Sequence, residues 1–244
     1  MHFGESIKPG QLHPGQLDEY LAMGWYRMRQ TIFTVTHGLS DEGDFFQIYW
    51  LRFAVPELKP RAAHKRIRKK CAGFEVRLEE LVNIGAQYEA LYAHYKKGIR
   101  FSPASTIAEC LFGYDDEGQD SIFRTKCISI FDGGKLIAAG FFDVDQVAAA
   151  SILHFYHPKY ARYSLGKYLI LLTLDYMSRS GLSLYYPGYV LQGSPKMNYK
   201  LFLGQQQAQY FDVESQTWRY FDPSILEMPE VPKGELYSPD ETED

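Results

Sequence analysis

The sequence predicts a mixed α/β fold of the α+β type, and two features of its second half carry that prediction. Asp132-Gly133-Gly134 separates two strand patterns, and glycines between such patterns are typical of a hairpin turn. A helix pattern at residues 165–179 then lies between strand patterns at residues 147–156 and 184–190. A strand–helix–strand step is normally right-handed, so its two strands should run parallel.

The other predicted elements divide the chain into two domains and a tail. A smaller N-terminal α+β domain should cover about residues 1–120 and a second domain about residues 121–225, followed by an acidic, disordered tail at residues 226–244. The first domain should hold a helix at residues 17–23, strands at 25–35, 45–55 and 74–81, a helix at 85–97 and a mobile connection at 103–118. The second should hold strands at residues 127–131 and 135–142 around the turn, and a final hairpin of residues 207–213 and 217–221.

Composition and charge exclude several classes of protein. Hydrophobic residues make up 45% of the 244-residue chain, enough for a substantial core, whereas the net charge of -4 names no partner. Cys71, Cys110 and Cys127 include no CxxC pair, which argues against a disulfide framework and a four-thiolate zinc site. The start has no apolar signal-peptide core, and the most apolar stretch, residues 168–174, is too short to span a membrane. We therefore expect a cytoplasmic protein without a metal site and without a membrane or DNA partner.

A phosphate-binding loop is predicted where the helix at residues 165–179 begins. Backbone N–H groups at a helix start are unpaired and carry partial positive charge, and glycine lets a ligand approach the backbone. Two cations flank this start. The alternative is an ordinary helix start with Ser164 as its N-cap. The candidate binding residues here are Arg162, Ser164, Leu165, Gly166 and Lys167.

Tyrosines and lysines cluster beyond the buried strand at residues 184–190. Tyr hydroxyls and Lys amines there could orient an ester carbonyl or its leaving 3′-oxygen, and Tyr rings could stack on the terminal adenine of an RNA. The alternative is an aromatic strand packed under the sheet with a polar loop after it. The candidate catalytic residues are Tyr186, Tyr189, Lys196, Tyr199 and Lys200.

A basic segment lies at residues 59–70, with seven Lys or Arg residues and no acid. Such a run fits binding to tRNA phosphates with salt-dependent affinity, and its alternative is a solvated basic face. By contrast, His94, His154 and His157 have no trustworthy ligand spacing, and His154 within its strand is expected to be a core residue. The candidate tRNA-binding residues are Lys59, Arg61, Lys65, Arg66, Arg68, Lys69 and Lys70.

Several separate motifs, in order, resemble one family. They are Ser164-Leu165-Gly166, Leu184-Tyr185-Tyr186-Pro187-Gly188-Tyr189, Pro195-Lys196-Met197-Asn198-Tyr199-Lys200 and a lone Trp218. In type and spacing they are similar to the C-terminal domain of the arginyl-tRNA–protein transferases and their bacterial aspartate/glutamate leucyl relatives. The resemblance covers about residues 127–221 and implies an aminoacyl-transfer domain of the GCN5-related N-acetyltransferase (GNAT) kind, which the predicted order of elements also matches.

The first half resembles the same family more weakly, through Gly24-Trp25 and Arg27 in an opening helix and strand. It would thus be an arginyl-transferase-like N-terminal domain. The family normally has a cysteine cluster soon after this opening, whereas residues 36–50 contain no cysteine and only His37. The resemblance therefore does not extend to metal- or redox-linked control.

The resemblance implies an enzyme that moves arginine or leucine from charged tRNA to the N-terminal α-amine of acceptor proteins. Family analogy further implies acceptors with an acidic first residue, which the transfer marks for degradation under the N-end rule. The tRNA is the co-substrate, and no other cofactor is implied. The helix-start residues would hold the acceptor-end phosphates, the Tyr and Lys cluster would line the transfer site, and the basic segment would hold the tRNA body.

Two other functions stay open. A coenzyme A-dependent N-acetyltransferase would use the same fold and phosphate loop, although only Gly166 of the usual glycine-rich pattern is present. A non-catalytic tRNA- or protein-binding descendant of the family would explain the absent cysteine cluster, and it would bind tRNA without turnover.

Overall fold

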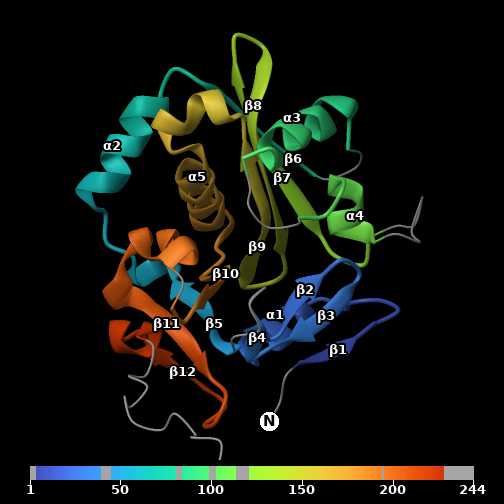
Figure 1. Ribbon diagram of the computed structural model, residues 1–244, viewed down its shortest axis with the longest axis vertical. Coiled ribbons are helices and arrows are strands. Elements are labelled where there is room, and N and C mark those ends of the chain that lie inside the picture. The colour runs from blue at the N-terminus through green and yellow to red at the C-terminus, as the bar shows by residue number, and fades with distance from the viewer. Residues whose placement is uncertain are drawn as a thin grey trace, which may run out of the picture.

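A large mixed sheet forms the centre of the molecule in the computed structural model, which describes residues 4–39, 45–80, 84–98, 103–113, 121–193 and 195–227 (Figure 1). The strands follow the order β12-β11-β5-β10-β9-β8-β7-β6, and β4 pairs with β5 beside this path. They are β4 (His37–Leu39), β5 (Phe45–Ala54), β6 (Glu75–Glu80), β7 (Thr125–Asp132), β8 (Lys135–Val144), β9 (Ala148–Tyr156), β10 (Leu184–Leu191), β11 (Ala208–Asp212) and β12 (Thr217–Tyr220).

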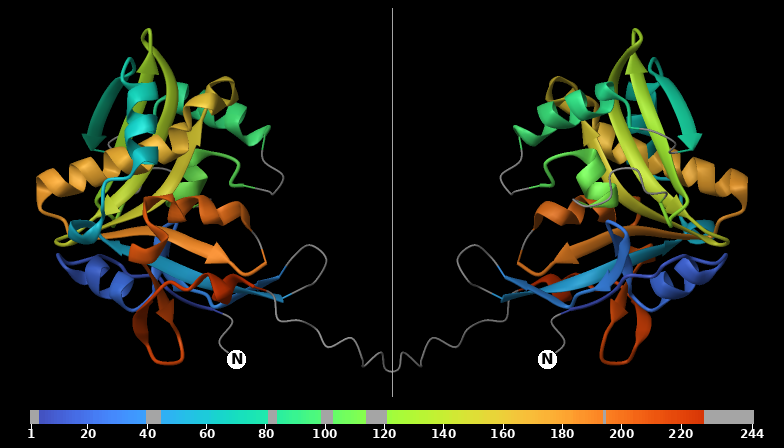
Figure 2. Two further views of the ribbon diagram at one scale, coloured as in Figure 1. Left: turned by 90° about the vertical axis from the view of Figure 1, so that its left-hand side faces the viewer. Right: turned by 90° about the vertical axis from the view of Figure 1, so that its right-hand side faces the viewer.

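Helices cover both faces of this sheet. Along β8, Ala138 and Phe142 pack into the core that contains helix α5 (Leu165–Ser180). The intervening Ala139 and Phe141 pack against helices α3 (Ala86–Lys96) and α4 (Ile107–Phe112), because successive side chains of a strand point to opposite faces. Figure 1 shows α5 on one side of β8 and α3 and α4 on the other, and Figure 2 views the molecule from each of these sides. The mixed α/β fold class is therefore confirmed.

The β7–β8 hairpin forms at the predicted turn. Gly133 and Gly134 have φ of 55 and 82, in the left-handed region that glycine adopts without steric cost. A two-residue type I′ turn requires positive φ at both central positions. Asp132 accordingly pairs with Lys135 across the turn.

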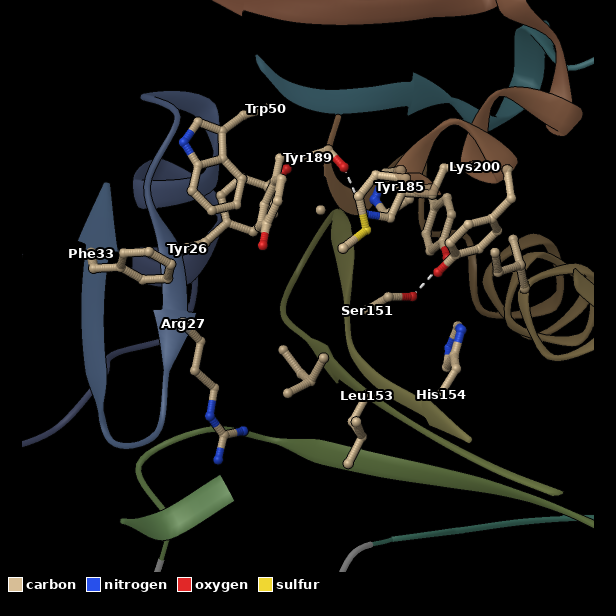
Figure 3. A pocket seen from close by; sticks show the side chains of 16 residues that line it. Tyr26, Arg27, Phe33, Trp50, Ser151, Leu153, His154, Tyr185, Tyr189 and Lys200 are labelled. Carbon is tan, nitrogen blue, oxygen red and sulfur yellow. Dashed lines mark hydrogen bonds between the residues drawn. The ribbon is translucent and has the colours of Figure 1, made fainter. Parts of the chain in front are cut away.

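Strands β9 and β10 run parallel, as predicted, but they pair over a short length only. Leu184, Tyr185 and Tyr186 of β10 pair with β9, after which β10 follows β5 alone, with a register shift between Tyr185 and Gly188. The two strands therefore diverge at the end of β9 that leads into α5, a region shown from close by in Figure 3. The β7–β8–β9–α5–β10 order is the one predicted for a GNAT-like domain.

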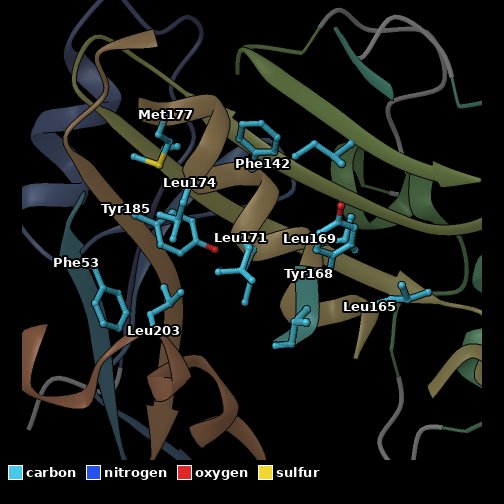
Figure 4. Packing of buried hydrophobic residues seen from close by; sticks show 14 of the residues in the cluster. Phe53, Phe142, Leu165, Tyr168, Leu169, Leu171, Leu174, Met177, Tyr185 and Leu203 are labelled. Atoms are coloured by element: carbon cyan, nitrogen blue, oxygen red, sulfur yellow. The ribbon is translucent and has the colours of Figure 1, made fainter. Parts of the chain in front are cut away.

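Helix α5 is largely buried, as its sequence predicts. Leu169, Leu171 and Met177 are at most 2% exposed and pack between the sheet and helix α2 (Ala62–Cys71) (Figure 4). Full burial of one such side chain stabilises the fold by about 1.5–3 kcal/mol. Helix α2 was not predicted: the basic segment also carries Ile67 and Cys71, whose spacing of four residues buries them on one face against α5.

The first half of the chain contributes to the same sheet. Strand β5 lies between β11 and β10, and β6 pairs with β7 at the sheet edge. The sheet therefore contains strands from both predicted domains, and a boundary near residue 120 stays a prediction.

A separate three-stranded sheet packs beside helix α1 (Gln16–Ala22) and has the order β1-β3-β2. The prediction of one strand at residues 25–35 is wrong, because the segment folds into a hairpin whose turn contains Arg29 at φ 59. The turn lacks the usual glycine signal; instead the Arg27 side chain donates to the Arg29 carbonyl at 2.6 Å. The three strands are β1 (Glu5–Ile7), β2 (Tyr26–Met28) and β3 (Thr31–Thr34).

Two further predictions are settled in part. The connection expected at residues 103–118 contains α4, whose start is capped by Thr106 Oγ1 accepting from the Glu109 N–H at 2.9 Å, while residues 114–118 lie outside the described residues. The final hairpin is confirmed as β11 paired with β12. Of the acidic tail, residues 228–244 also lie outside them. Among the described helices none is long and apolar enough to cross a membrane.

Candidate active site

A cavity of about 230 Å³, the transfer cavity, lies where β9 and β10 diverge (Figure 3). Residues 151–154 of β9 form one wall and Gly188 of β10 another. The 3₁₀ segment η3 (Pro195–Leu203) adds Tyr199 and Lys200. The first 50 residues of the chain supply the remaining side, through Tyr26, Arg27, Phe33 and Trp50.

Four aromatic side chains, Tyr26, Phe33, Trp50 and Tyr189, form what we name the aromatic wall. The rings of Tyr26 and Trp50 stack with their centroids 3.9 Å apart. Phe33 and Tyr189 meet Trp50 edge-on, with centroids at 5.5 and 5.2 Å. Offset-stacked and edge-on pairs are the favourable arrangements of aromatic rings. The wall is therefore a preformed apolar surface on one side of the cavity.

Lys200 lies beside Tyr189, at one end of this wall, and is 7% exposed. Its Nζ donates to the Tyr189 carbonyl oxygen at 2.6 Å. The Tyr189 ring lies 4.9 Å from the same nitrogen. Burial disfavours the charged amine and lowers the pKa of Lys200 to about 7. A large fraction of this side chain is therefore neutral near physiological pH.

The described residues that line the cavity include no Asp or Glu. Besides Lys200, the lining contains Arg27, which forms an ion pair with a carboxylate behind the cavity wall. The Arg27 guanidinium lies 2.8 Å from the Asp143 carboxylate, with both side chains at most 1% exposed. Burial raises the pKa of Asp143, and Arg27 opposes that rise. Among the lysines and arginines that the structure describes in this lining, Lys200 is therefore the one without a carboxylate partner.

His154 lines both the transfer cavity and a second cavity. Burial, with the nearby Lys200, lowers the pKa of His154 to about 4, so the imidazole is neutral at physiological pH. The ring packs closely against Gly140, where a Cβ would lie 2.8 Å from the His154 Cδ2. Beside it, the Tyr185 hydroxyl and the Ser151 Oγ are hydrogen bonded at 2.6 Å, and burial raises the pKa of Tyr185.

The second cavity, of about 270 Å³, lies at the start of α5, and we name it the helix-start cavity. Ser164, Gly166 and Lys167 line it, as the sequence predicts for a phosphate-binding loop, and it shares His154 and Tyr199 with the transfer cavity. Ser164 occupies the N-cap position of α5, as the alternative expects, but its side chain makes no capping hydrogen bond. The unpaired N–H groups of α5 therefore stay available to an anion.

Two members of the predicted loop do not join this cavity. Leu165 is fully buried in the core around α5 and cannot contact a ligand. Arg162 lies on the exposed 3₁₀ segment η2 (Pro158–Tyr163), where its guanidinium donates to the Tyr163 hydroxyl at 2.9 Å.

The predicted catalytic residues are brought together only in part. Tyr189, Tyr199 and Lys200 line the transfer cavity. Tyr186 does not line the cavity: it is fully buried, and its ring packs against those of Trp218 and Tyr26, with centroids 5.6 and 6.0 Å apart. The side chain of Lys196 lies outside the described residues.

The basic segment forms an exposed surface beside the helix-start cavity. Arg68 forms an ion pair that joins α2 to α5: its guanidinium donates to both Asp175 carboxylate oxygens, the longer contact at 2.8 Å. Lys70 Nζ donates to the Arg162 carbonyl at 3.4 Å and so joins α2 to the segment that leads into α5. The exposed members are Lys59, Arg61, Lys65, Arg66, Lys69 and Lys70.

Sequence reasoning missed the aromatic wall and Ser151. Trp50 lies in a strand pattern that the sequence shows to be dense in aromatics, but nothing in that pattern connects it with Tyr189. The sequence connects Arg27 only with the family resemblance, because its partner Asp143 lies 116 residues away.

The chain is similar to several transferases. It is 25% identical to an aspartate/glutamate leucyltransferase of Helicobacter hepaticus over 85% of this chain and 83% of that protein. A protein of the same name from Xanthomonas euvesicatoria is 30% identical over 62% of this chain and 61% of that protein. The arginyl-tRNA–protein transferase 1 of Saccharomyces cerevisiae is 38% identical over 30% of this chain and 14% of that protein. The matched part of the chain thus spans less than two thirds of the last two proteins.

A solved GCN5-related glucosamine N-acetyltransferase region of a fungal β-N-acetylglucosaminidase matches with a TM-score of 0.38 and 8% identity, over 71% of this chain and 20% of that one. That likeness is too weak to support a conclusion. The family model described as "Arginine-tRNA-protein transferase, C terminus" matches residues 87–210. This range contains α5, β10, Lys200 of the transfer cavity and Lys167 of the helix-start cavity. Because this match covers just over half of the 244 residues, the chain belongs to the arginine-tRNA-protein transferase family.

Proposed function

We propose that this protein transfers an amino acid, arginine or leucine, from charged tRNA to the N-terminal α-amine of acceptor proteins. One observation carries the proposal: two cavities adjoin through His154 and Tyr199, one at an open helix start and one with a buried lysine. Such a pair suits a reactant with an anionic end and a reactive carbonyl end. Acceptors with an acidic first residue, marked in this way for degradation in the cytoplasm, complete the proposed role.

The helix-start cavity is the proposed place for the phosphates at the acceptor end of the tRNA. Lys167 and the first N–H groups of α5 supply positive charge there. The 3′-ester would then pass His154 and Tyr199 and reach the transfer cavity. Its walls hold the two reactants close and keep bulk water away from the ester, which favours aminolysis over hydrolysis.

The exposed lysines and arginines of α2 are the proposed contacts for the tRNA body. They continue the basic surface from the helix-start cavity, because Lys70 contacts the Arg162 carbonyl. Each phosphate that they neutralise releases counterions, so tRNA affinity should fall steeply with salt. The reaction proposed here needs no cofactor besides the aminoacyl-tRNA.

Transfer of radiolabelled arginine or leucine from charged tRNA to peptides beginning with Asp, Glu, Lys or Arg tests the proposal. We expect label from one donor on the acidic peptides. Salt-sensitive tRNA binding without label would instead support a non-catalytic descendant. A melting temperature raised by acetyl-CoA, with neither label nor tRNA binding, would support a coenzyme A-dependent acetyltransferase.

A further inference from the structure

The amine of Lys200 is held in place by the backbone of the strand that it faces. Its Nζ lies 2.6 Å from the Tyr189 carbonyl, on the stretch where β10 has left β9. The neighbouring Gly188, at φ 95, has a backbone conformation that other residues rarely adopt. A register shift between Tyr185 and Gly188 brings this carbonyl to the cavity. The position of the amine is thus built into the divergence of the two strands.

The surroundings of this amine suit its neutral form. A lysine ammonium has three N–H donors, and the Tyr189 carbonyl is its one close oxygen partner among the described residues. The Met197 sulfur, at 4.0 Å, is a weak acceptor, and the rings of Tyr189 and Tyr199 give partial compensation at 4.9 and 5.8 Å. A neutral amine keeps the bond to the carbonyl and can direct its lone pair into the cavity.

The other titratable groups of the cavity are less suited to accept a proton at neutral pH. His154, from β9, has its pKa lowered to about 4 by burial and is therefore a weak base. From β10, Tyr185 is hydrogen bonded to Ser151, and burial raises the pKa of both Tyr185 and Tyr189. The Arg27 guanidinium is paired with Asp143. Tyr199, from η3, is likewise a weaker candidate, since burial raises its pKa to about 12.

We propose that Lys200 is the general base of aminoacyl transfer, a role that rests on the function proposed above. The neutral α-amine of the acceptor attacks the ester carbonyl carbon, and a new N–C bond forms. The lone pair of Lys200 Nζ accepts the proton that the attacking nitrogen releases. When the C–O bond to the ribose 3′-oxygen breaks, the same proton passes from Lys200 to that oxygen, so that tRNA leaves with a free hydroxyl and Lys200 is neutral again.

Three variants test this role. Lys200→Ala removes the base, Lys200→Arg introduces a permanently charged group that cannot accept a proton, and Lys135→Ala removes an exposed lysine at the β7–β8 turn as a matched control. Transfer is measured at saturating tRNA with Asp- and Glu-initiated peptides across pH 5.5–9, and tRNA binding reports that each variant is folded. Ethylamine and the less basic 2-fluoroethylamine, which is similar in size, are then added to Lys200→Ala.

General-base catalysis typically contributes about 10²–10⁴-fold, so kcat of Lys200→Ala and Lys200→Arg should fall by at least about 100-fold while the acceptor KM changes little. Added amines should restore part of the kcat of Lys200→Ala, the more basic amine giving the faster reaction. A kcat within about threefold of wild type in either variant would overturn the role, as would a loss confined to KM, which would make Lys200 a binding group for the acceptor carboxylate. No transfer by the wild type would overturn the proposed function itself.

Discussion

Asp18 and Asp145 cap each other's backbone across the junction between helix α1 and the large sheet. The Asp145 carboxylate accepts from the N–H groups of Gly15 and Leu17, both at 3.0 Å. In return, the Asp18 carboxylate accepts from the N–H groups of residues 146–148 at 2.9–3.1 Å. These hydrogen bonds hold α1 against the turn between β8 and β9. Strands β2 and β3, which follow α1, carry Tyr26 and Phe33 of the aromatic wall.

Replacement of Asp145 by Ala should loosen this junction. The change leaves the start of α1 without its charged acceptor, and hydrogen bonds to charged groups contribute about 1.5–3 kcal/mol each. We expect the free energy of unfolding in urea to fall by about 2 kcal/mol. Glu214→Ala, which alters an exposed carboxylate, is the control. Equal losses in the two variants would show that the junction adds no stability.

Gly140→Ala should disturb the ring between the two cavities. The new Cβ would lie 2.8 Å from the His154 Cδ2, closer than such atoms approach in proteins. The ring must therefore shift, and we expect a lower melting temperature together with slower transfer. Gly73→Ala is the matched control, because no atom lies within 4 Å of its added Cβ. If both variants melt and react like the wild type, the contact with His154 has no consequence.

Acid should destabilise the protein through His154. Its folded-state pKa is lowered to about 4, whereas an unperturbed histidine titrates near 6.5. Between these values the unfolded chain binds a proton that the folded protein excludes, so stability falls as the pH drops from 6.5 towards 4. The loss attributable to this residue could reach roughly 3 kcal/mol, at about 1.4 kcal/mol per pKa unit.

Urea unfolding of wild type and His154→Phe at pH 4.5, 5.5 and 7 measures that contribution. The difference in unfolding free energy between the two proteins should shift in favour of the variant as the pH falls. Above pH 7 it should be constant, since neither the folded nor the unfolded histidine is then charged. A difference independent of pH over the whole range would contradict the assignment.

The basic residues of α2 should separate into two classes. Lys65 and Lys69 are exposed, so the double replacement Lys65→Ala/Lys69→Ala should weaken tRNA binding and reduce the slope of log affinity against log salt by about one per lysine. Arg68 contacts Asp175, and its replacement by Ala should lower the unfolding free energy by up to about 1 kcal/mol. An unchanged salt slope in the double variant would place the tRNA elsewhere.

Local patterns were sufficient for much of the fold. The glycines at the β7–β8 turn, the parallel β9–α5–β10 unit and the burial of α5 depend on residues close together in the sequence, so each could be predicted. The break between β2 and β3 could not, because its turn is held by the Arg27 side chain and not by glycine or proline.

The candidate site was predictable to a smaller extent. The sequence places Gly166 and Lys167 at a helix start and Tyr189, Tyr199 and Lys200 after a buried strand, and the structure brings these residues to two adjoining cavities. The sequence could not show which of the neighbouring Tyr185 and Tyr186 lines the cavity, since successive side chains of a strand point to opposite faces of the sheet. Which face borders the cavity depends on the strands and helices packed there.

The sequence by itself determined the α/β class, the family and the segments that carry the candidate chemistry, because these follow from periodicity and short motifs. Only the tertiary structure decided that Lys200 lies beside Tyr189 of the aromatic wall, and that Arg27 forms an ion pair with Asp143. Burial and charge pairing arise from contacts between residues far apart in the chain, such as Arg27 and Asp143. The lowered pKa of Lys200 is a consequence of that packing, since desolvation of the amine is its cause.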